Sequence, residues 1–158
     1  MSSRRYDVRM TDDSDLLARV ARLEAIHDIE RVSANYCRGA DRRDLRLFLS
    51  VWASDAVWQV SDDQRFTGAA QIERGIRGQW EGVLRAFHWT SNSSIDLDGK
   101  HATAIRDVDA ELQLLDGSWL AVAGEYTDSL VNVHGEWKIT IRRARTFSER
   151  VILTDSKV

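Results

Sequence analysis

The second half of the chain consists of four segments of strand length, separated by short polar turns. The turns are marked by Asp96–Gly99, Asp116–Gly117 and His134–Gly135. The segments between them are Phe87–Leu97, Ala102–Leu114, Trp119–Val133 and Trp137–Val151. Strands joined by such short turns pair with their neighbours in antiparallel fashion. This half of the chain therefore predicts a long antiparallel meander, which needs a second layer to cover one of its faces.

The first third of the chain predicts helices that supply this layer. Apolar residues recur every three or four positions, which is helical spacing. They are Leu16, Val20, Leu23, Ile26, Ile29, Val32 and Tyr36. Asp12–Asp15 offers N-cap residues for this helix, and Gly39 is the expected stop.

A shorter helix, a strand and a third helix are expected next. The pattern predicts a helix over Leu45–Trp52 and a strand over Ala56–Val60, which a turn at 61–64 ends. Helical spacing returns over Ala69–Leu84, despite two glycines within it. Helices first and a meander last indicate an α+β fold, in which the helices cover one face of a curved sheet.

Size and charge narrow the classes of protein. The chain of 158 residues fits one domain, residues 13–158, after a flexible polar tail over residues 1–12. The net charge of -3 gives no reason to expect nucleic acid as a partner. Neither a long apolar segment nor a signal-peptide pattern is seen, so we expect a cytoplasmic protein without a membrane partner. Cys37 is the single cysteine, which excludes an internal disulfide framework.

One polar set is not required by the hydrophobic pattern. Tyr36 and Asp41 lie where the first helix runs out, and His88 lies in the first segment of the meander. An aspartate that orients a neutral imidazole, beside a phenol, is suited to removing a proton. If Asp41 accepts a hydrogen bond from one imidazole nitrogen, the other nitrogen is left free as a base.

Each of these residues also has a plain structural interpretation. Asp41 is at a position typical of a helix cap, and Tyr36 continues the apolar stripe of its helix. Strand alternation places His88 on one face with Thr90 and Asn92, which suits either a pocket wall or a half-exposed strand. Close contact among Tyr36, Asp41 and His88 in the folded protein would favour a proton-transfer site over these structural roles.

Two further positions stay ambiguous. Strict strand alternation would send Arg143 to the core face, whereas a bulge would send Arg142 there instead. Asp107 lies in the middle of a strand, where it either reaches the pocket or belongs to an exposed acidic face. No His, Cys or carboxylate pair has convincing metal-ligand spacing, and no phosphate loop, dinucleotide fingerprint or serine-nucleophile elbow is present, so neither metal nor cofactor is expected.

Four stretches carry a resemblance to a known family. They are Tyr36-x4-Asp41, His88-x3-Asn92, Gly124–Asp128, and Gly135–Ile139 followed by Arg142-Arg143. With this order of elements, the chain from Leu16 to Val151 resembles the SnoaL-like branch of the nuclear-transport-factor-2-like superfamily. That branch includes polyketide cyclases, a dehydrochlorinase and dehydratases.

The resemblance implies both a shape and a chemistry. It implies a cone-shaped α+β barrel whose pocket has Asp41 and His88 at its floor. It also implies elimination or isomerisation without metal or cofactor, in a homo-oligomer such as a dimer or trimer. Fold alone would not license this function, because the superfamily is diverse.

The resulting hypothesis is a dehydratase or related β-elimination enzyme acting on a hydrophobic ring-type molecule. The expected catalytic residues are Asp41, His88, Tyr36 and Arg142, and the expected substrate contacts are Asn92, Asp107, Trp89 and Arg143. The aromatic residues suggest the ring-type substrate. A polyketide or terpenoid cyclase, or an isomerase, would use the same first proton transfer. A non-catalytic binding or oligomerisation module is the third possibility.

Overall fold

The computed structural model describes residues 13–153, so the tail predicted for residues 1–12 lies outside the described part. The helices are α1 (Asp13–Asp41), α2 (Leu45–Ser50) and α3 (Ala69–Gly82). The strands are β1 (Trp52–Gln59), β2 (Arg65–Thr67), β3 (Val83–Asp98), β4 (His101–Leu114), β5 (Trp119–Val133) and β6 (Glu136–Leu153). Helices precede the meander, as the α+β prediction requires.

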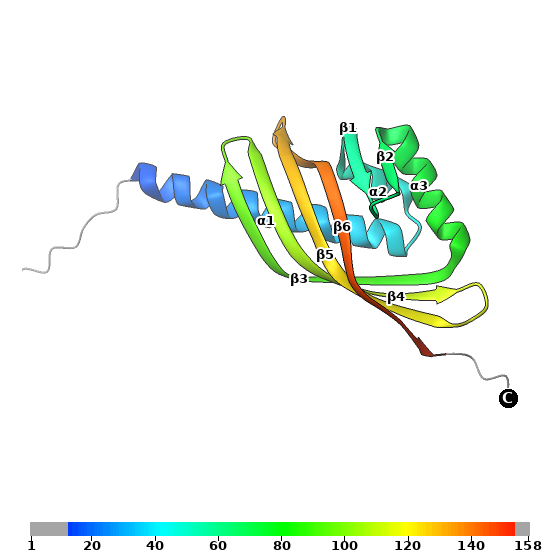
Figure 1. Ribbon diagram of the computed structural model, residues 1–158. Coiled ribbons are helices and arrows are strands. Elements are labelled where there is room, and N and C mark those ends of the chain that lie inside the picture. Colours follow the sequence, from blue (N-terminus) through cyan, green and yellow to red (C-terminus); the bar gives the residue numbers. More distant parts are fainter. Residues whose placement is uncertain (1–12, 154–158) are drawn as a thin grey trace, which may run out of the picture.

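The six strands form one curved, open sheet. Its order is β2-β1-β6-β5-β4-β3, and all neighbours pair antiparallel except β1 and β6, which are parallel. The sheet is therefore mixed and does not close into a complete barrel. In Figure 1, α1 runs across one face of the sheet, and α3 lies beyond the short strands β1 and β2. The concave face of the sheet is thus the face that the helices cover.

The core lies between α1, α2 and the concave face of the sheet. Its aromatic centre is Tyr36, Phe48, Trp52 and Trp58, whose rings contact one another at tilted or edge-on angles. Such geometries are preferred for aromatic pairs. Apolar side chains from α3 and from the inner faces of β4, β5 and β6 complete this core.

Gly39 has a different role from the one predicted. It does not end α1, which continues to Asp41. A Cβ at this position would lie 2.5 Å from the backbone nitrogen of Phe48, so the absence of a side chain lets α1 and α2 approach closely. The helix ends instead where Arg43 adopts a positive φ of 55° and Asp44 caps α2 by accepting a hydrogen bond from the backbone of Leu47.

Two helix boundaries and one short strand differ from the prediction. Trp52 begins β1 instead of ending α2, and Leu84 belongs to β3 instead of α3. The short strand β2 was missed, because three residues are too few to show an alternating pattern. Within residues 13–153, no helix combines the length and apolar character needed to cross a membrane.

Two of the three register shifts between β5 and β6 lie where they change which β6 side chains face the core. β5 pairs Ser129 with Ile141 but the next residue, Leu130, with Ile139, so Thr140 is the extra residue. The Thr140 hydroxyl donates a hydrogen bond to the Ser129 carbonyl oxygen at this point (3.0 Å). A second shift opposite Gly124 leaves Phe147 as an extra residue. Each bulge reverses the alternation of the strand beyond it.

Candidate functional site

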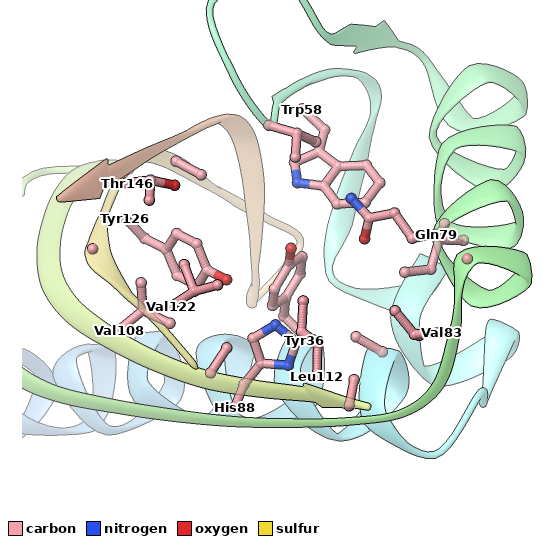
Figure 2. Close-up of a pocket in the computed structure, with 18 of the residues that line it drawn as sticks. Tyr36, Trp58, Gln79, Val83, His88, Val108, Leu112, Val122, Tyr126 and Thr146 are labelled. Atoms are coloured by element: carbon pink, nitrogen blue, oxygen red, sulfur yellow. The ribbon is translucent and has the colours of Figure 1, made fainter. Parts of the chain in front are cut away.

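A cavity of about 310 Å³ lies between the concave face of the sheet, the end of α1 and helix α3. Its walls are mostly apolar, and Figure 2 shows side chains from several elements pointing into it. The lining includes Tyr36, Ala40, Trp58, Ile76, Gln79, Trp80, Val83, His88, Val108, Leu112, Val122, Tyr126, Arg145 and Thr146. A largely apolar cavity with a few convergent polar groups is the usual form of a small-molecule site.

His88 lines this cavity, and its ring binds Asp41, which is not itself a lining residue. The His88 Nδ1 and an Asp41 carboxylate oxygen are 2.5 Å apart, and the second carboxylate oxygen accepts a hydrogen bond from the His88 backbone N–H at 3.0 Å. Because an ionised carboxylate only accepts hydrogen bonds, the pairing places the proton of a neutral imidazole on Nδ1. Nε2 is then free to accept a proton. Both side chains are mostly buried, with exposed fractions of 16% for His88 and 18% for Asp41.

The junction of three elements fixes Asp41 in place. The indole N–H of Trp80, at the end of α3, donates to the carbonyl oxygen of Ala40 (2.8 Å). The guanidinium of Arg43 donates to the carbonyl oxygens of Trp80 (3.0 Å) and Val83 (2.7 Å). These bonds tie the end of α1 to the start of β3, the strand that carries His88. Because the segments that carry Asp41 and His88 are joined in this way, the Asp41 carboxylate is held next to the His88 imidazole.

Tyr36 and Tyr126 add two phenols to the same cavity. Tyr36 comes from α1 and Tyr126 from β5, and their rings meet edge-on with centroids 5.7 Å apart. In Figure 2 both side chains reach the space above the His88 ring. Burial raises the pKa of Tyr36 to about 12, although the nearby Arg142 charge opposes the rise. Burial likewise raises the pKa of Tyr126 well above its ordinary value.

The bulge at Thr140 resolves the choice between the two arginines. Arg142 is fully buried on the inner face, whereas Arg143 is exposed. Arg142 nevertheless does not line the cavity, because Asp128 holds it through two hydrogen bonds of 2.7 and 2.6 Å. Its guanidinium lies over the rings of Tyr36 and Tyr126, 4.1 and 4.5 Å from their centroids.

A second buried arginine, Arg106 from β4, extends this charged group. It forms an ion pair with Glu30 at 3.0 Å and lies 4.0 Å from Asp128. Burial lowers the pKa of Arg106, although the charge of Asp128 opposes this effect. No sequence pattern indicated this residue, because an arginine in the middle of a strand ordinarily faces solvent.

The structure does not bring the other predicted contact residues to the cavity. Trp89 is 54% exposed on the outer face of β3, and Arg143 is exposed on β6. The Asn92 amide donates to the Asp107 carboxylate (2.7 Å), with both groups on the outer face of the sheet. Asn92 leaves the face of His88 because β3 has a bulge between Ser91 and Ser94, where Asn92 adopts a φ of 50°.

Several lining residues were not predicted from the sequence. Tyr126 lies within the Gly124–Asp128 stretch, where alternation with buried Gly124 and Asp128 was an available signal for an inward side chain. Gln79, Arg145 and Thr146 line the cavity as well. No sequence pattern marked Gln79 as a lining residue. Arg145 and Thr146 directly precede the bulge at Phe147, where simple strand alternation does not predict which side chains face inward. Among residues 13–153, no group of three or more His, Cys, Asp or Glu side chains is placed to hold a metal ion.

Comparisons with known proteins place this geometry in a family. A family model described as a SnoaL-like domain matches residues 21–143. No protein of curated function matches the sequence. Solved structures do match, at sequence identities that establish the fold alone.

Two of these structures span almost the whole fold. A hexachlorocyclohexane dehydrochlorinase from Novosphingobium barchaimii (LinA-type3) superimposes with a TM-score of 0.79 and 19% identity, covering 88% of this chain and 95% of that one. A putative scytalone dehydratase from Novosphingobium aromaticivorans gives a TM-score of 0.76 and 21% identity, covering 87% and 97%. With its family model matched over most of its length and its fold shared with these proteins, the chain belongs to the SnoaL-like family of the NTF2-like superfamily.

Proposed function

We propose that the protein is a cofactor-independent lyase in which His88 removes a proton from a carbon of a hydrophobic ring-type substrate. The observation that carries this proposal is the contact between the Asp41 carboxylate and Nδ1 of His88, whose ring lines a largely apolar cavity. A carboxylate in this position selects the useful tautomer and stabilises the imidazolium that proton transfer creates. The phenol of Tyr36, which stays protonated at neutral pH, is the expected hydrogen-bond donor that positions the leaving oxygen.

The reaction balances without any further reagent. The C–H bond breaks, its proton goes to His88 Nε2, and its electron pair forms a new carbon–carbon double bond. The group on the neighbouring carbon leaves with its own bonding pair. If that group is hydroxide, the imidazolium returns the proton to it, so water departs and His88 becomes neutral again.

The cavity supports an apolar ring as the substrate. Its walls are formed by aliphatic side chains and by the indoles of Trp58 and Trp80, and its volume of about 310 Å³ suits a small ring system. The names of two structural relatives point to the same reaction class, since one is a dehydrochlorinase and the other a putative dehydratase. The dehydratase and dehydrochlorinase reactions are both eliminations.

Hydrogen–deuterium exchange tests the proposal even though the natural substrate is not identified. The protein is incubated in D2O with a panel of cyclic ketones and cyclic β-hydroxy ketones, and exchange at the carbon next to the carbonyl is followed by NMR. We expect His88→Gln to lower the exchange rate by about 10²–10⁴-fold, which is the usual contribution of a general base. His101→Gln, an exposed histidine at the start of β4, is the matched control and should exchange at the wild-type rate.

The products separate elimination from its rivals. Loss of the mass of one water molecule identifies a dehydratase, whereas unchanged mass with a moved double bond or a new ring identifies an isomerase or cyclase. Equal exchange rates in the wild type and His88→Gln would overturn the proposal. So would a wild-type protein that accelerates exchange in no member of the panel, which would instead indicate a binding module.

A further inference from the structure

One side of the sheet has no covering layer, although large aromatic side chains lie on it. In Figure 1, α1 covers one face of the sheet, and no element of residues 13–153 covers the opposite, outer face of strands β3 to β6. Phe87 and Trp89 are 41% and 54% exposed there, and their ring centroids are 6.3 Å apart. The ring of Phe87 also stacks on that of Trp119 from β5, at 6.1 Å and nearly parallel. Exposed aromatic surface of this kind is typical of a site against which another molecule packs.

A row of carboxylates runs along β4 on the same face. Asp107, Asp109 and Glu111 alternate with buried residues of the strand, so all three side chains point outward. Successive outward side chains on a strand are about 7 Å apart, and like charges at this spacing repel one another. Within residues 13–153, Asp109 and Glu111 form no ion pair, and Asp107 binds the uncharged amide of Asn92. The row therefore lacks a compensating cation.

A row of arginines lies on β6. Arg145 and Arg150 are exposed, and β5 pairs them with Glu125 and Ala121. Glu125 alternates with buried residues of β5, and Ala121 lines a shallow groove on the outer face together with Arg150. Both arginines therefore belong to the outer face, and the exposed Arg143 extends their row.

The two rows lie at the same levels of the sheet, on either side of β5. Ala121 of β5 pairs with Glu111 on one side and with Arg150 on the other. Asp107 and Arg145 likewise share one partner on β5. Because neighbouring strands are about 4.8 Å apart, each acid is about 10 Å from the arginine at its level. This distance is too great for an ion pair within one chain.

A second copy of the same face supplies the charge that each row lacks. A partner with groups of only one sign would match one row and meet the other with like charge. A two-fold axis that runs along β5 places β6 of the other copy over β4, and the reverse. Glu111 then faces Arg150 of the other copy, and Asp107 faces Arg145. Packed sheets keep their strands within about 30° of each other, so these levels stay matched near the axis.

The side chains between the charged pairs suit such a contact. Ala121 and Ala123 are small, and they line a groove of about 430 Å³ beside Trp89. Small residues on the central strand let two sheets approach to their usual separation of about 10 Å. Asp109 is level with Ser148, so in this arrangement it faces a hydroxyl group and takes no part in the ion pairs.

We propose that the outer face of β3–β6 binds a second copy of this chain, with the carboxylates of β4 against the arginines of β6 from the other copy. The contact does not depend on the proposed reaction. It also gives a role to Trp89 and Asp107, which were expected at the substrate but lie on this face.

Charge reversal tests the contact. Analytical ultracentrifugation of the full chain over a range of concentrations gives the oligomer mass and the dissociation constant. We expect the wild type to be a dimer, and a larger closed assembly with the same response to the variants would support the same face. Glu111→Arg and Arg150→Glu each place like charges together at two symmetric points, so each should raise the dissociation constant at least about tenfold. Glu24→Arg, on the exposed part of α1 across the sheet, is the matched control and should change it by no more than about twofold.

An equimolar mixture of Glu111→Arg and Arg150→Glu distinguishes pairing between copies from a general effect of charge. In a mixed dimer the two reversed charges face each other, and the second contact keeps its native residues. Association should therefore return to within about threefold of the wild type, while thermal unfolding verifies that each variant is folded. A monomeric wild type, or a dimer that both single variants leave intact, would overturn the proposal. So would single variants that dissociate and stay apart when mixed.

Discussion

Two aspartates in this fold each pair with a basic side chain, Asp41 with His88 and Asp128 with Arg142, and the two pairs differ in their surroundings. His88 lines the cavity and binds Asp41, with side chains 16% and 18% exposed, whereas Asp128 and Arg142 are 1% and 0% exposed. In the first pair the partner can be neutral and keeps a free ring nitrogen. In the second pair both partners are charged and the carboxylate is occupied by two hydrogen bonds. The first pair is suited to moving a proton, and the second to holding charge still.

The difference shows why the more buried pair is not the candidate base. A fully buried ion pair must recover a large desolvation cost through close geometry, so it tolerates little movement or change of charge. Asp128 also faces Arg106, which places one carboxylate among two guanidinium groups. Loss of that carboxylate would leave Arg142 without its ion-pair partner and Arg106 with Glu30 alone. The pair of Asp41 and His88, by contrast, is partly exposed, and Asp41 directly faces the imidazole whose charge would change.

Substitution of Asp128 should have the largest effect on stability. We expect Asp128→Asn to lower the free energy of unfolding by about 3–5 kcal/mol, the usual result of breaking a buried pair on one side. Urea unfolding followed by tryptophan fluorescence measures the change. Asp109→Asn, on the exposed face of β4, is the matched control and should alter stability by no more than about 0.5 kcal/mol. If both variants lost an equally small amount of unfolding free energy, the special role of Asp128 in stability would be disproved.

High pH should reveal the buried phenol beside Arg142. Burial raises the pKa of Tyr36 from 10.0 to about 12, so the folded protein holds this proton more tightly than the unfolded chain does. The resulting stability is fully present below pH 10 and is lost as the pH rises towards 12. The loss amounts to about 2–3 kcal/mol, at 1.36 kcal/mol for each pKa unit.

Comparison with Tyr36→Phe isolates this contribution. The variant has no proton to lose at this position, so its unfolding free energy should fall less steeply than that of the wild type between about pH 10 and 11.5, a window set by the pKa of about 12. Urea midpoints at several pH values measure the two slopes. If the unfolding free energies of the wild type and Tyr36→Phe fell equally steeply with pH, the raised pKa of Tyr36 would be disproved.

The sequence predicted regular elements far better than their irregularities. Hydrophobic periodicity located α1, and the glycine turns located the meander, with Trp119–Val133 found at both ends. Both signals are local and depend on spacing alone. The fold class followed from the order of the elements, and the resemblance to the SnoaL-like family was confirmed by the family model.

Side-chain direction could not be predicted across the bulges at Asn92 and Thr140. Asn92 was expected beside His88 and is turned to the outer face by the bulge in β3, while Thr140 turns Arg142 inward. A bulge depends on the pairing of two strands, and the sequence of one strand does not disclose it. Tyr36, on helix α1, and His88, in the regularly paired stretch of β3 between its two register shifts, do reach the same cavity.

The third test changes Asp41 by a single group and should have the smallest effect on folding. In Asp41→Asn the side-chain oxygen can still accept the His88 backbone N–H, but an amide hydrogen would face Nδ1. That hydrogen favours the tautomer with its proton on Nε2, which removes the base from the cavity. We expect ketone exchange to fall by about 10²-fold or more, while the free energy of unfolding falls by only about 1–2 kcal/mol. NMR exchange rates and urea unfolding of the same preparation measure both effects. If Asp41→Asn instead loses as much stability as Asp128→Asn and exchange falls only with the folded fraction, both carboxylates are structural, and the contrast between the two pairs reduces to one of exposure.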